Sequence, residues 1–160
     1  MKDFLLIALL IIIFAPIYLV SLYEIPWQIN TDEITIMAVS KKLVEGHADP
    51  FGLSFYFGFP NLSFLVFGWL GKALGGIALL NMRIIHGFFG LSIVILSYLF
   101  FRITTGSRSL GAGGAIILGA NHALIGVSRM AMRDNSGLLV ELAALTLLIF
   151  GLEKKSFLYS

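Results

Sequence analysis

The feature that most constrains this chain is an uncharged apolar run near its start, Phe4–Leu22. A helix needs about 20 apolar residues to cross the hydrocarbon core of a bilayer. No small-residue cleavage site follows the run, so it predicts a retained transmembrane helix rather than a signal peptide. Tyr23 and Trp27, which follow it, suit the membrane–water interface.

The composition of the whole chain agrees with a membrane protein. Apolar residues make up 58% and charged residues 12%, whereas about a quarter of a soluble domain is charged. A net charge of +2 without a basic run gives no basis for a nucleic-acid partner. The chain has no cysteine, which excludes disulfides, thiolate metal sites and cysteine nucleophiles.

Three further apolar segments predict membrane spans: Ile84–Phe101, Leu110–Val127 and Gly137–Leu152. The second of these is rich in glycine and alanine, which allow helices to approach closely inside a bundle. We therefore predict an all-α integral membrane protein with about four transmembrane helices.

Two interfacial helices are expected between the first and second spans, at about 31–46 and 60–74. In the first, five apolar residues share one side: Ile36, Met37, Val39, Leu43 and Val44. Such a helix is expected to lie in the interface with this side toward lipid. The second helix is short for a span, so it is expected to lie flat or to re-enter.

Charged residues set the expected orientation. If the 60–74 helix stays on one face, Lys2, the Arg102–Arg108 turn and Lys154-Lys155 fall on the inner side, as the positive-inside rule expects. Two polar bends, Asp32-Glu33 and Ser128–Asp134, then meet at the extracytoplasmic face. If that helix crossed instead, the two bends would lie on opposite faces.

The acidic pair Asp32-Glu33 has two interpretations. Asn30 can cap the helix and Glu33 can complete a capping box, which would make the pair structural. Alternatively, the pair lies where a membrane helix meets water, at the mouth of the space that the other helices enclose. There it would do chemistry.

The second bend carries two arginines. Arg129 and Arg133 are four residues apart, so they project the same way if the bend is helical. They are either interfacial anchors or an anion clamp, because a guanidinium binds phosphate through a planar fork. Lys72 is a weaker candidate for the same task, since a lysine at a helix end often reaches to the headgroups.

Further acids extend this constellation. Glu141 lies two helical turns past Asp134, and an acid inside an apolar span is a functional hypothesis. The alternative is a buried pair with His86, Asn121 or His122. A divalent cation held by Asp32, Glu33, Asp134 and Asp49 would suit these carboxylates, although no HExxH spacing is present and the sequence does not require a metal.

Taken in order, these features resemble the N-terminal part of the GT-C type glycosyltransferases, with protein O-mannosyltransferases and lipid A aminoarabinose transferases as the nearest kin. The residues that carry the resemblance are Asp32-Glu33, Ala38 and Gly46 in the tail of their helix, the Pro60 helix that ends in glycines, Arg83 heading the next span, and Ser128-Arg129 with Asp134 five residues after that arginine. The chain departs from the family where Gly58-Phe59-Pro60 replaces the frequent His-Pro-Pro. These enzymes carry many more spans, so residues 1–160 are expected to be the N-terminal part of such a transmembrane domain.

The resemblance implies transfer of a sugar from a polyprenyl-phosphate donor to an unknown acceptor, which could be a protein, lipid or glycan, with inversion at the outer face. It implies catalytic roles for Asp32, as the base, and Glu33. It also implies donor-phosphate contacts from Arg129, Arg133, Arg83 and Lys72, and orienting roles for Asp134 and Glu141. No cofactor is required; a metal, if used, would bind Asp32 and Asp134. The rivals are a small non-catalytic membrane subunit or carrier-like bundle, and a truncated, inactive product.

Overall fold

The computed structural model describes residues 2–53, 58, 60–132 and 134–158, with side chains described as far as residue 152. These residues form seven α-helices and no strand, with one isolated bridge between Leu53 and Pro60. The expected all-α class is therefore confirmed. The helices are α1 (Lys2–Leu19), α2 (Thr31–Val44), α3 (Asn61–Ala73), α4 (Leu79–Thr105), α5 (Arg108–Gly119), α6 (His122–Arg129) and α7 (Asp134–Leu158).

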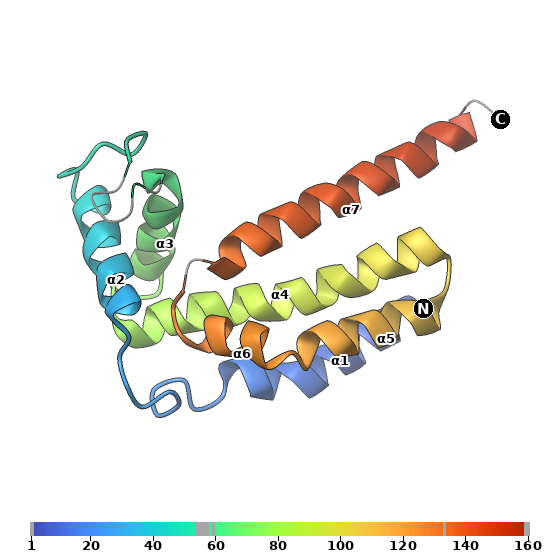
Figure 1. Cartoon of the computed structure of the whole chain (residues 1–160), viewed down its shortest axis with the longest axis horizontal. Coiled ribbons are helices and arrows are strands. Elements are labelled where there is room, and N and C mark those ends of the chain that lie inside the picture. Colours follow the sequence, from blue (N-terminus) through green and yellow to red (C-terminus); the bar gives the residue numbers. More distant parts are fainter. Residues whose placement is uncertain (1, 54–57, 59, 133, 159–160) are drawn as a thin grey trace.

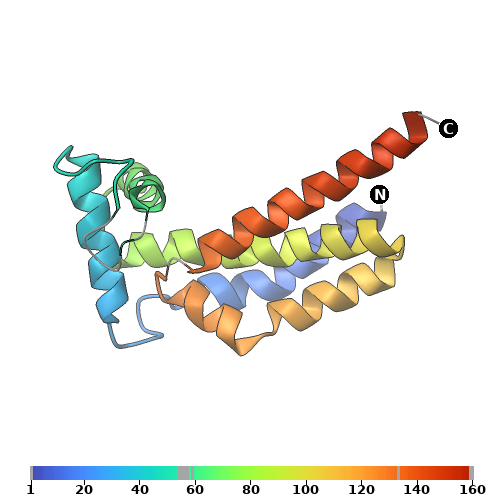
Figure 2. The same ribbon diagram turned by 45° about the horizontal axis from the view of Figure 1, so that its top comes forward.

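The long helices lie along one direction, and the two short helices between α1 and α4 gather at one end of them. In Figure 1, α1, α4 and α5 run roughly side by side, while α7 leaves α4 at an angle toward the C-terminus. Figure 2 shows α2 and α3 set across the same end of the bundle. We call this the α2 end of the bundle. It also holds the starts of α4 and α7 and the end of α6.

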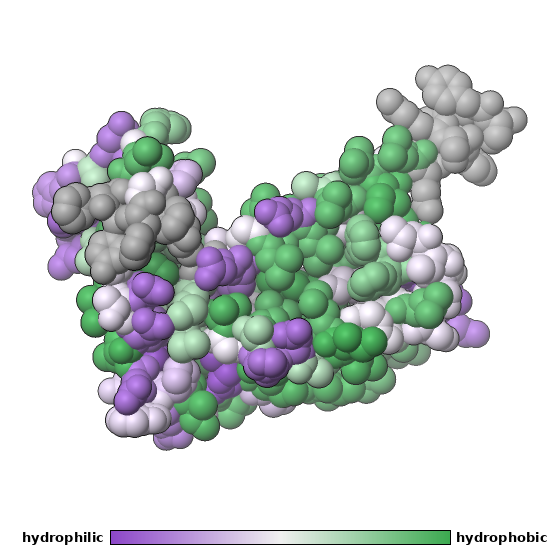
Figure 3. Space-filling view, viewed as in Figure 1, coloured by the Kyte–Doolittle hydropathy of each residue, from purple (hydrophilic) through white to green (hydrophobic). Residues whose placement is uncertain are grey.

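Within the part of the chain that the structure describes, three helices are long and apolar enough to cross a bilayer: α1, α4 and the Asp134–Leu152 part of α7. The pair α5 and α6 would make a fourth span if it crosses as one bent unit. Figure 3 shows hydrophobic side chains over most of the long helices, with hydrophilic ones gathered at the α2 end. The chain is compatible with a multi-pass membrane protein.

The expected continuous span Leu110–Val127 is wrong in one respect, because it is two helices that meet at an angle of 59°. The break falls at Ala120 and Asn121. Asn121 Oδ1 accepts the backbone N–H groups of Ala123 at 2.9 Å and Leu124 at 3.3 Å, which caps the start of α6. A capping asparagine offers the backbone a new helix start, so the apolar run is interrupted.

Helix α4 is the element against which most others pack, and two of its glycines permit this. A Cβ added at Gly87 would lie 2.6 Å from the carbonyl oxygen of Tyr18 in α1. One added at Gly90 would lie 2.4 Å from Ser128 Oγ in α6. The Tyr18 hydroxyl also donates to the Gly119 carbonyl at 3.0 Å, so the same residue caps the end of α5.

The apolar side of α2 was expected to face lipid, but it packs against other helices instead. Ile36 and Leu43 are buried in a cluster that includes Phe64 and Phe67 of α3 and Met82 of α4. The two short helices cross closely at Gly68, where a Cβ would lie 2.8 Å from the Ser40 carbonyl oxygen. Protein therefore covers this side, because α3 supplies the apolar surface that the sequence pattern alone assigned to lipid.

The opposite end of the bundle is held by Asp3. Its carboxylate accepts from the Tyr98 hydroxyl at 2.6 Å, Arg102 Nε at 3.3 Å and Arg108 Nε at 3.1 Å. These contacts join the start of α1 to the end of α4 and the start of α5. The arginines of the expected inner side thus share the end remote from α2.

Candidate functional site

The site predicted from the sequence depends on two polar bends meeting, and the structure joins them through Glu33. Glu33 lies in the first turn of α2 and is fully buried. Its Oε1 accepts the backbone N–H of Ala131, 98 residues away, at 3.0 Å. The bend that opens α2 and the turn between α6 and α7 therefore lie at the same end of the bundle, as predicted.

The principal partner of Glu33 is Arg83, near the start of α4, which is only 1% exposed. Arg83 Nε donates to Glu33 Oε1 at 2.7 Å, and Arg83 Nη2 donates to Oε2 at 2.9 Å. Asn30 N–H donates to the same Oε2 at 3.0 Å. Each carboxylate oxygen thus accepts two hydrogen bonds, which fills the lone pairs of the group.

Arg83 is equally occupied. Its Nη1 donates to the carbonyls of Leu22 at 2.9 Å and Pro26 at 2.8 Å. Its Nη2 donates to Gln28 at 3.1 Å as well as to Glu33. All five N–H donors of the guanidinium are used, so Arg83 has none left for the donor phosphate that the sequence assigned to it.

The Glu33–Arg83 pair joins the connection after α1 to the starts of α2 and α4. Burial by itself would raise the pKa of the Glu33 carboxyl. The hydrogen bonds from Arg83, Asn30 and Ala131 outweigh burial and hold the pKa below its ordinary value. Glu33 is therefore a charged, saturated group that positions the bend, and the expectation that it contacts substrate directly does not fit its surroundings.

The expected cap of α2 is confirmed. Asn30 Oδ1 accepts the Asp32 N–H at 3.2 Å, and both halves of the capping box between Asn30 and Glu33 are present. The structural interpretation of the acidic pair therefore applies to Glu33, which forms the capping box. The functional interpretation is left for Asp32, whose side chain takes no part in the box.

Asp32 is exposed in the first turn of α2. Within the described part of the chain, its carboxylate has no hydrogen bond or ion pair. An acid with free lone pairs, carried on a helix that the neighbouring residue fixes in place, can accept a proton from a bound hydroxyl.

Arg129 lies at the end of α6, and its side chain reaches across to α1. Its Nη1 donates to the Ile17 carbonyl, and its Nη2 donates to Val20 at 2.9 Å and Ile25 at 3.0 Å. Ile17 lies in the last turn of α1, whose carbonyls lack helical partners, and Val20 follows that turn directly, whereas Ile25 lies in the connection toward α2. Arg129 therefore caps the end of α1, while its Nε–H and one N–H of Nη1 have no partner among the described residues.

The predicted pairing of Arg129 with a second arginine does not follow from helix geometry. Helix α6 ends at Arg129, and Met130 is extended, with ψ 129°. The bend is therefore not helical directly after Arg129, which the predicted projection of the two arginines required. Arg133 itself lies outside the described residues.

The other predicted residues lie on exposed surfaces. Lys72 is in the last turn of α3, with its ammonium 5.2 Å from the centre of the Trp69 ring. Asp134 and Glu141 are exposed on α7. Glu141 makes no hydrogen bond with His86, Asn121 or His122 across the described residues, so the alternative of a buried pair is wrong.

Sequence reasoning missed a buried polar cluster beside the Glu33–Arg83 pair. Asn135 Nδ2 donates to the His86 carbonyl at 2.9 Å and to Ser128 Oγ at 3.4 Å. These contacts join α7 to α4 and α6. The only signal for this cluster in the sequence was the amide of Asn135, which follows the polar Ser128–Asp134 bend at the start of an apolar helix.

A metal centre does not form from the side chains that the structure describes. No three His, Cys, Asp or Glu residues gather closely enough to hold an ion within those ranges. Asp32 and Asp134, the suggested ligands, share no contact there. No family model, no curated protein and no solved structure matches the chain.

Proposed function

We propose that the chain is the N-terminal part of a multi-pass membrane glycosyltransferase of the GT-C type that uses a polyprenyl-phosphate sugar donor. The observation that carries the proposal is the contrast between two adjacent carboxylates. Glu33 is buried with both oxygens saturated, whereas Asp32 is exposed and unpaired among the described residues. One acid fixes the helix and the other is free to react.

The proposed site faces the extracytoplasmic side. Arg102 and Arg108 lie at the end of the bundle remote from α2, and basic residues favour the cytoplasmic side of a membrane. Asp32 then opens toward the outer face, where the donor's sugar and the acceptor would meet.

In this proposal Asp32 is the general base. Its carboxylate takes the proton of the acceptor hydroxyl while that oxygen bonds to the anomeric carbon of the sugar. The bond from that carbon to the phosphate oxygen breaks, and the lipid phosphate leaves with its electron pair. A single displacement of this kind inverts the anomeric carbon.

The phosphate needs a fixed positive charge as it leaves. The free Nε of Arg129 is the proposed donor, with Lys72 and Arg133 as further candidates, while Arg83 acts only through its hold on Glu33. Asp134 and Glu141 are the proposed orienting acids on α7. A divalent cation is not required by this arrangement.

The test is Asp32→Asn in the full-length protein, reconstituted in liposomes with a radiolabelled polyprenyl-phosphate sugar and membrane acceptors. Loss of a general base should lower transfer by about 10²-fold or more. Glu24→Gln, which changes an exposed acid outside the site, is the matched control. Transfer by Asp32→Asn at the wild-type rate would remove Asp32 from the role of base.

A second candidate is a non-catalytic membrane subunit or carrier-like bundle. It is favoured by the finding that Glu33, Arg83 and most donors of Arg129 join helices to one another. In that case no sugar transfer is measured with any donor, while Glu33→Gln still destabilises the protein.

A further inference from the structure

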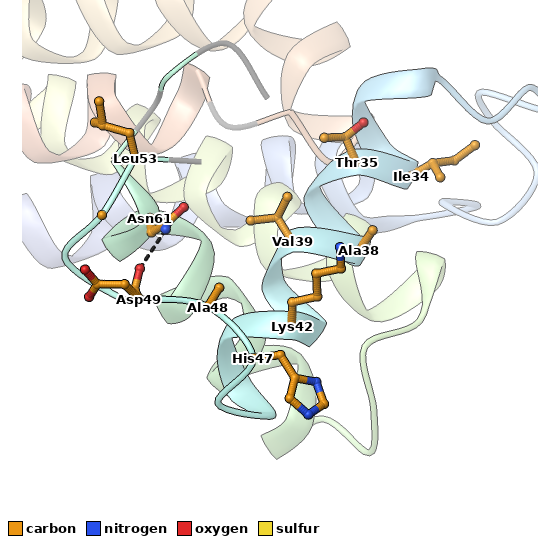
Figure 4. Close-up of a pocket in the computed structure, with 11 residues that line it drawn as sticks. Ile34, Thr35, Ala38, Val39, Lys42, His47, Ala48, Asp49, Leu53 and Asn61 are labelled. Atoms are coloured by element: carbon orange, nitrogen blue, oxygen red, sulfur yellow. Dashed lines mark hydrogen bonds between the residues drawn. The ribbon is translucent and has the colours of Figure 1, made fainter. Parts of the chain in front are cut away.

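Beside Asp32, the exposed face of α2 forms one wall of a pocket of about 540 Å³. Figure 4 shows α2 on one side and the connection from His47 to Leu53 on the other, with Asn61 between them. A volume of several hundred cubic ångströms is typical of small-molecule sites. The lining residues used below are Thr35, Val39, Lys42, Asp49 and Asn61.

The second wall of the pocket is held together by hydrogen bonds. Asn61 Nδ2 donates to the Asp49 carbonyl at 2.7 Å, and Asn61 N–H donates to Gly52 at 3.0 Å. Asp49 Oδ1 accepts the Phe51 N–H at 3.0 Å, which closes a turn. The opposite face of α2 is fixed by the buried Glu33–Arg83 pair, so both walls are held in place.

The charge that faces the pocket is positive. Lys42 lies along α2 with its ammonium beside Ala38, and the Asp49 carboxylate turns away from α2 (Figure 4). Lys42 forms no ion pair with any described residue. A free ammonium beside a pocket favours an anionic group, and lysine binds phosphate as a point charge.

Two oxygen acceptors line the same space. Asn61 is 5% exposed, and its Oδ1 has no hydrogen-bond partner among the described residues. Thr35 Oγ1 donates to the Thr31 carbonyl at 3.0 Å, and no described residue donates to it, so it can accept a hydrogen bond from a ligand. Buried or half-buried acceptors favour a ligand that brings hydroxyl donors. The rest of the lining is mostly apolar: Ile34, Ala38, Val39, Ala48 and Leu53.

We propose that this pocket binds the phosphate ester of a polyol or sugar, with the phosphate at Lys42 and hydroxyls at Thr35 and Asn61. The spacing connects it to the site above, because Asp32, Thr35, Val39 and Lys42 follow one side of α2. Thr35 lies about 4.5 Å along the helix axis from Asp32. This inference rests on the proposed transferase function: the ligand is the acceptor, and one of its hydroxyls is presented to Asp32.

The test uses the full-length protein in phosphatidylcholine nanodiscs, with its lysines dimethylated with ¹³C so that each keeps its charge and gives an NMR signal. Glycerol 3-phosphate, glycerol and inorganic phosphate are titrated in one arm. In the other, phosphatidylglycerol replaces part of the phosphatidylcholine. A saturable shift of the Lys42 signal in the first arm identifies a free phosphate ester; a shift only in the second identifies a lipid headgroup.

Two variants with a matched control test the residues. Binding to the variants is measured by isothermal titration calorimetry, because Lys42→Gln has no Lys42 signal. Lys42→Gln should weaken the binding of glycerol 3-phosphate about tenfold or more, as expected for one charge-assisted contact. Lys41→Gln changes the neighbouring lysine, which is 67% exposed and 4.0 Å from Glu45, and should stay within about twofold of wild type. Thr35→Val should weaken the binding of glycerol 3-phosphate severalfold and leave the binding of inorganic phosphate unchanged.

Equal losses in Lys42→Gln and Lys41→Gln, or no saturable shift in either arm, would overturn the assignment. Binding is read independently of transfer, so the two proposals can fail separately. Intact transfer without binding at Lys42 rejects only the pocket. Binding at Lys42 in a protein whose transfer is unaffected by Asp32→Asn rejects only the transferase mechanism.

Discussion

Glu33 and Arg83, fifty residues apart in the chain, form a buried two-pronged ion pair with N–O distances of 2.7 and 2.9 Å. Every lone pair of the carboxylate and every N–H of the guanidinium is engaged. This pair fixes the start of α2, and with it the position of Asp32.

Glu33→Gln should lower the free energy of unfolding by about 3–5 kcal/mol, because it leaves the Arg83 charge buried without its partner. The measurement is thermal or denaturant unfolding in detergent micelles. Asp32→Asn is the control, and should change stability by no more than about 1 kcal/mol, the size of a helix-dipole effect. Similar losses of stability in both variants would contradict a specific contribution of the Glu33–Arg83 ion pair.

The double change Glu33→Gln with Arg83→Met should cost less than the sum of the two single changes. Each single variant leaves one half of the pair unsatisfied, whereas the double variant removes both charges. A double-mutant cycle on unfolding free energies measures this coupling. Strict additivity would mean that the two side chains do not interact.

The stability of the protein should depend on pH through Glu33. Its pKa is lower in the folded chain than the ordinary value of 4.5, so the unfolded state binds its proton first as the pH falls. The contribution of Glu33 is complete above pH 4.5, decreases as the pH falls below that value, and is lost once the folded carboxyl is protonated. Unfolding free energies of wild type and Glu33→Gln, whose amide resembles the protonated carboxyl, should converge as the pH falls from 7 to 3.

Arg129→Ala should destabilise the protein by about 1–3 kcal/mol, because carbonyls in the last turn of α1 and in the connection after it lose their donor. Arg129→Lys should recover only part of this, since an ammonium lacks the planar fork. Unfolding in detergent checks both. In the transfer assay, a rise in KM for the donor in Arg129→Lys, beyond what its lost stability explains, would support contact with phosphate.

Gly68→Ala should destabilise the crossing of α2 and α3, because its Cβ would lie 2.5 Å from Val44 Cγ2 and 2.8 Å from the Ser40 carbonyl oxygen. Overpacking of this kind costs about 1–3 kcal/mol. Gly113→Ala, in α5, meets nothing within 4 Å and should be neutral or slightly stabilising. Equal effects at the two glycines would argue against a close crossing.

Local features of this protein were predictable from the sequence. The apolar runs predicted the long apolar helices α1, α4 and α7, because hydrophobic length is a property of consecutive residues. The capping box at Asn30 and Glu33 was predictable for the same reason, since its two members lie three residues apart. The break at Asn121 was missed, although its signal was local, because hydropathy outweighed a capping residue in the prediction.

What only the tertiary structure decided is which polar group meets which. The sequence placed Glu33 among the catalytic acids and Arg83 and Arg129 among the phosphate contacts. Folding instead paired Glu33 with Arg83 and set Arg129 on the end of α1. The physical reason is that a charge removed from water must find partners wherever packing brings them, fifty or a hundred residues away, and no helical period encodes that choice. The same packing covered the apolar side of α2 with α3 and left Asp32 exposed beside it.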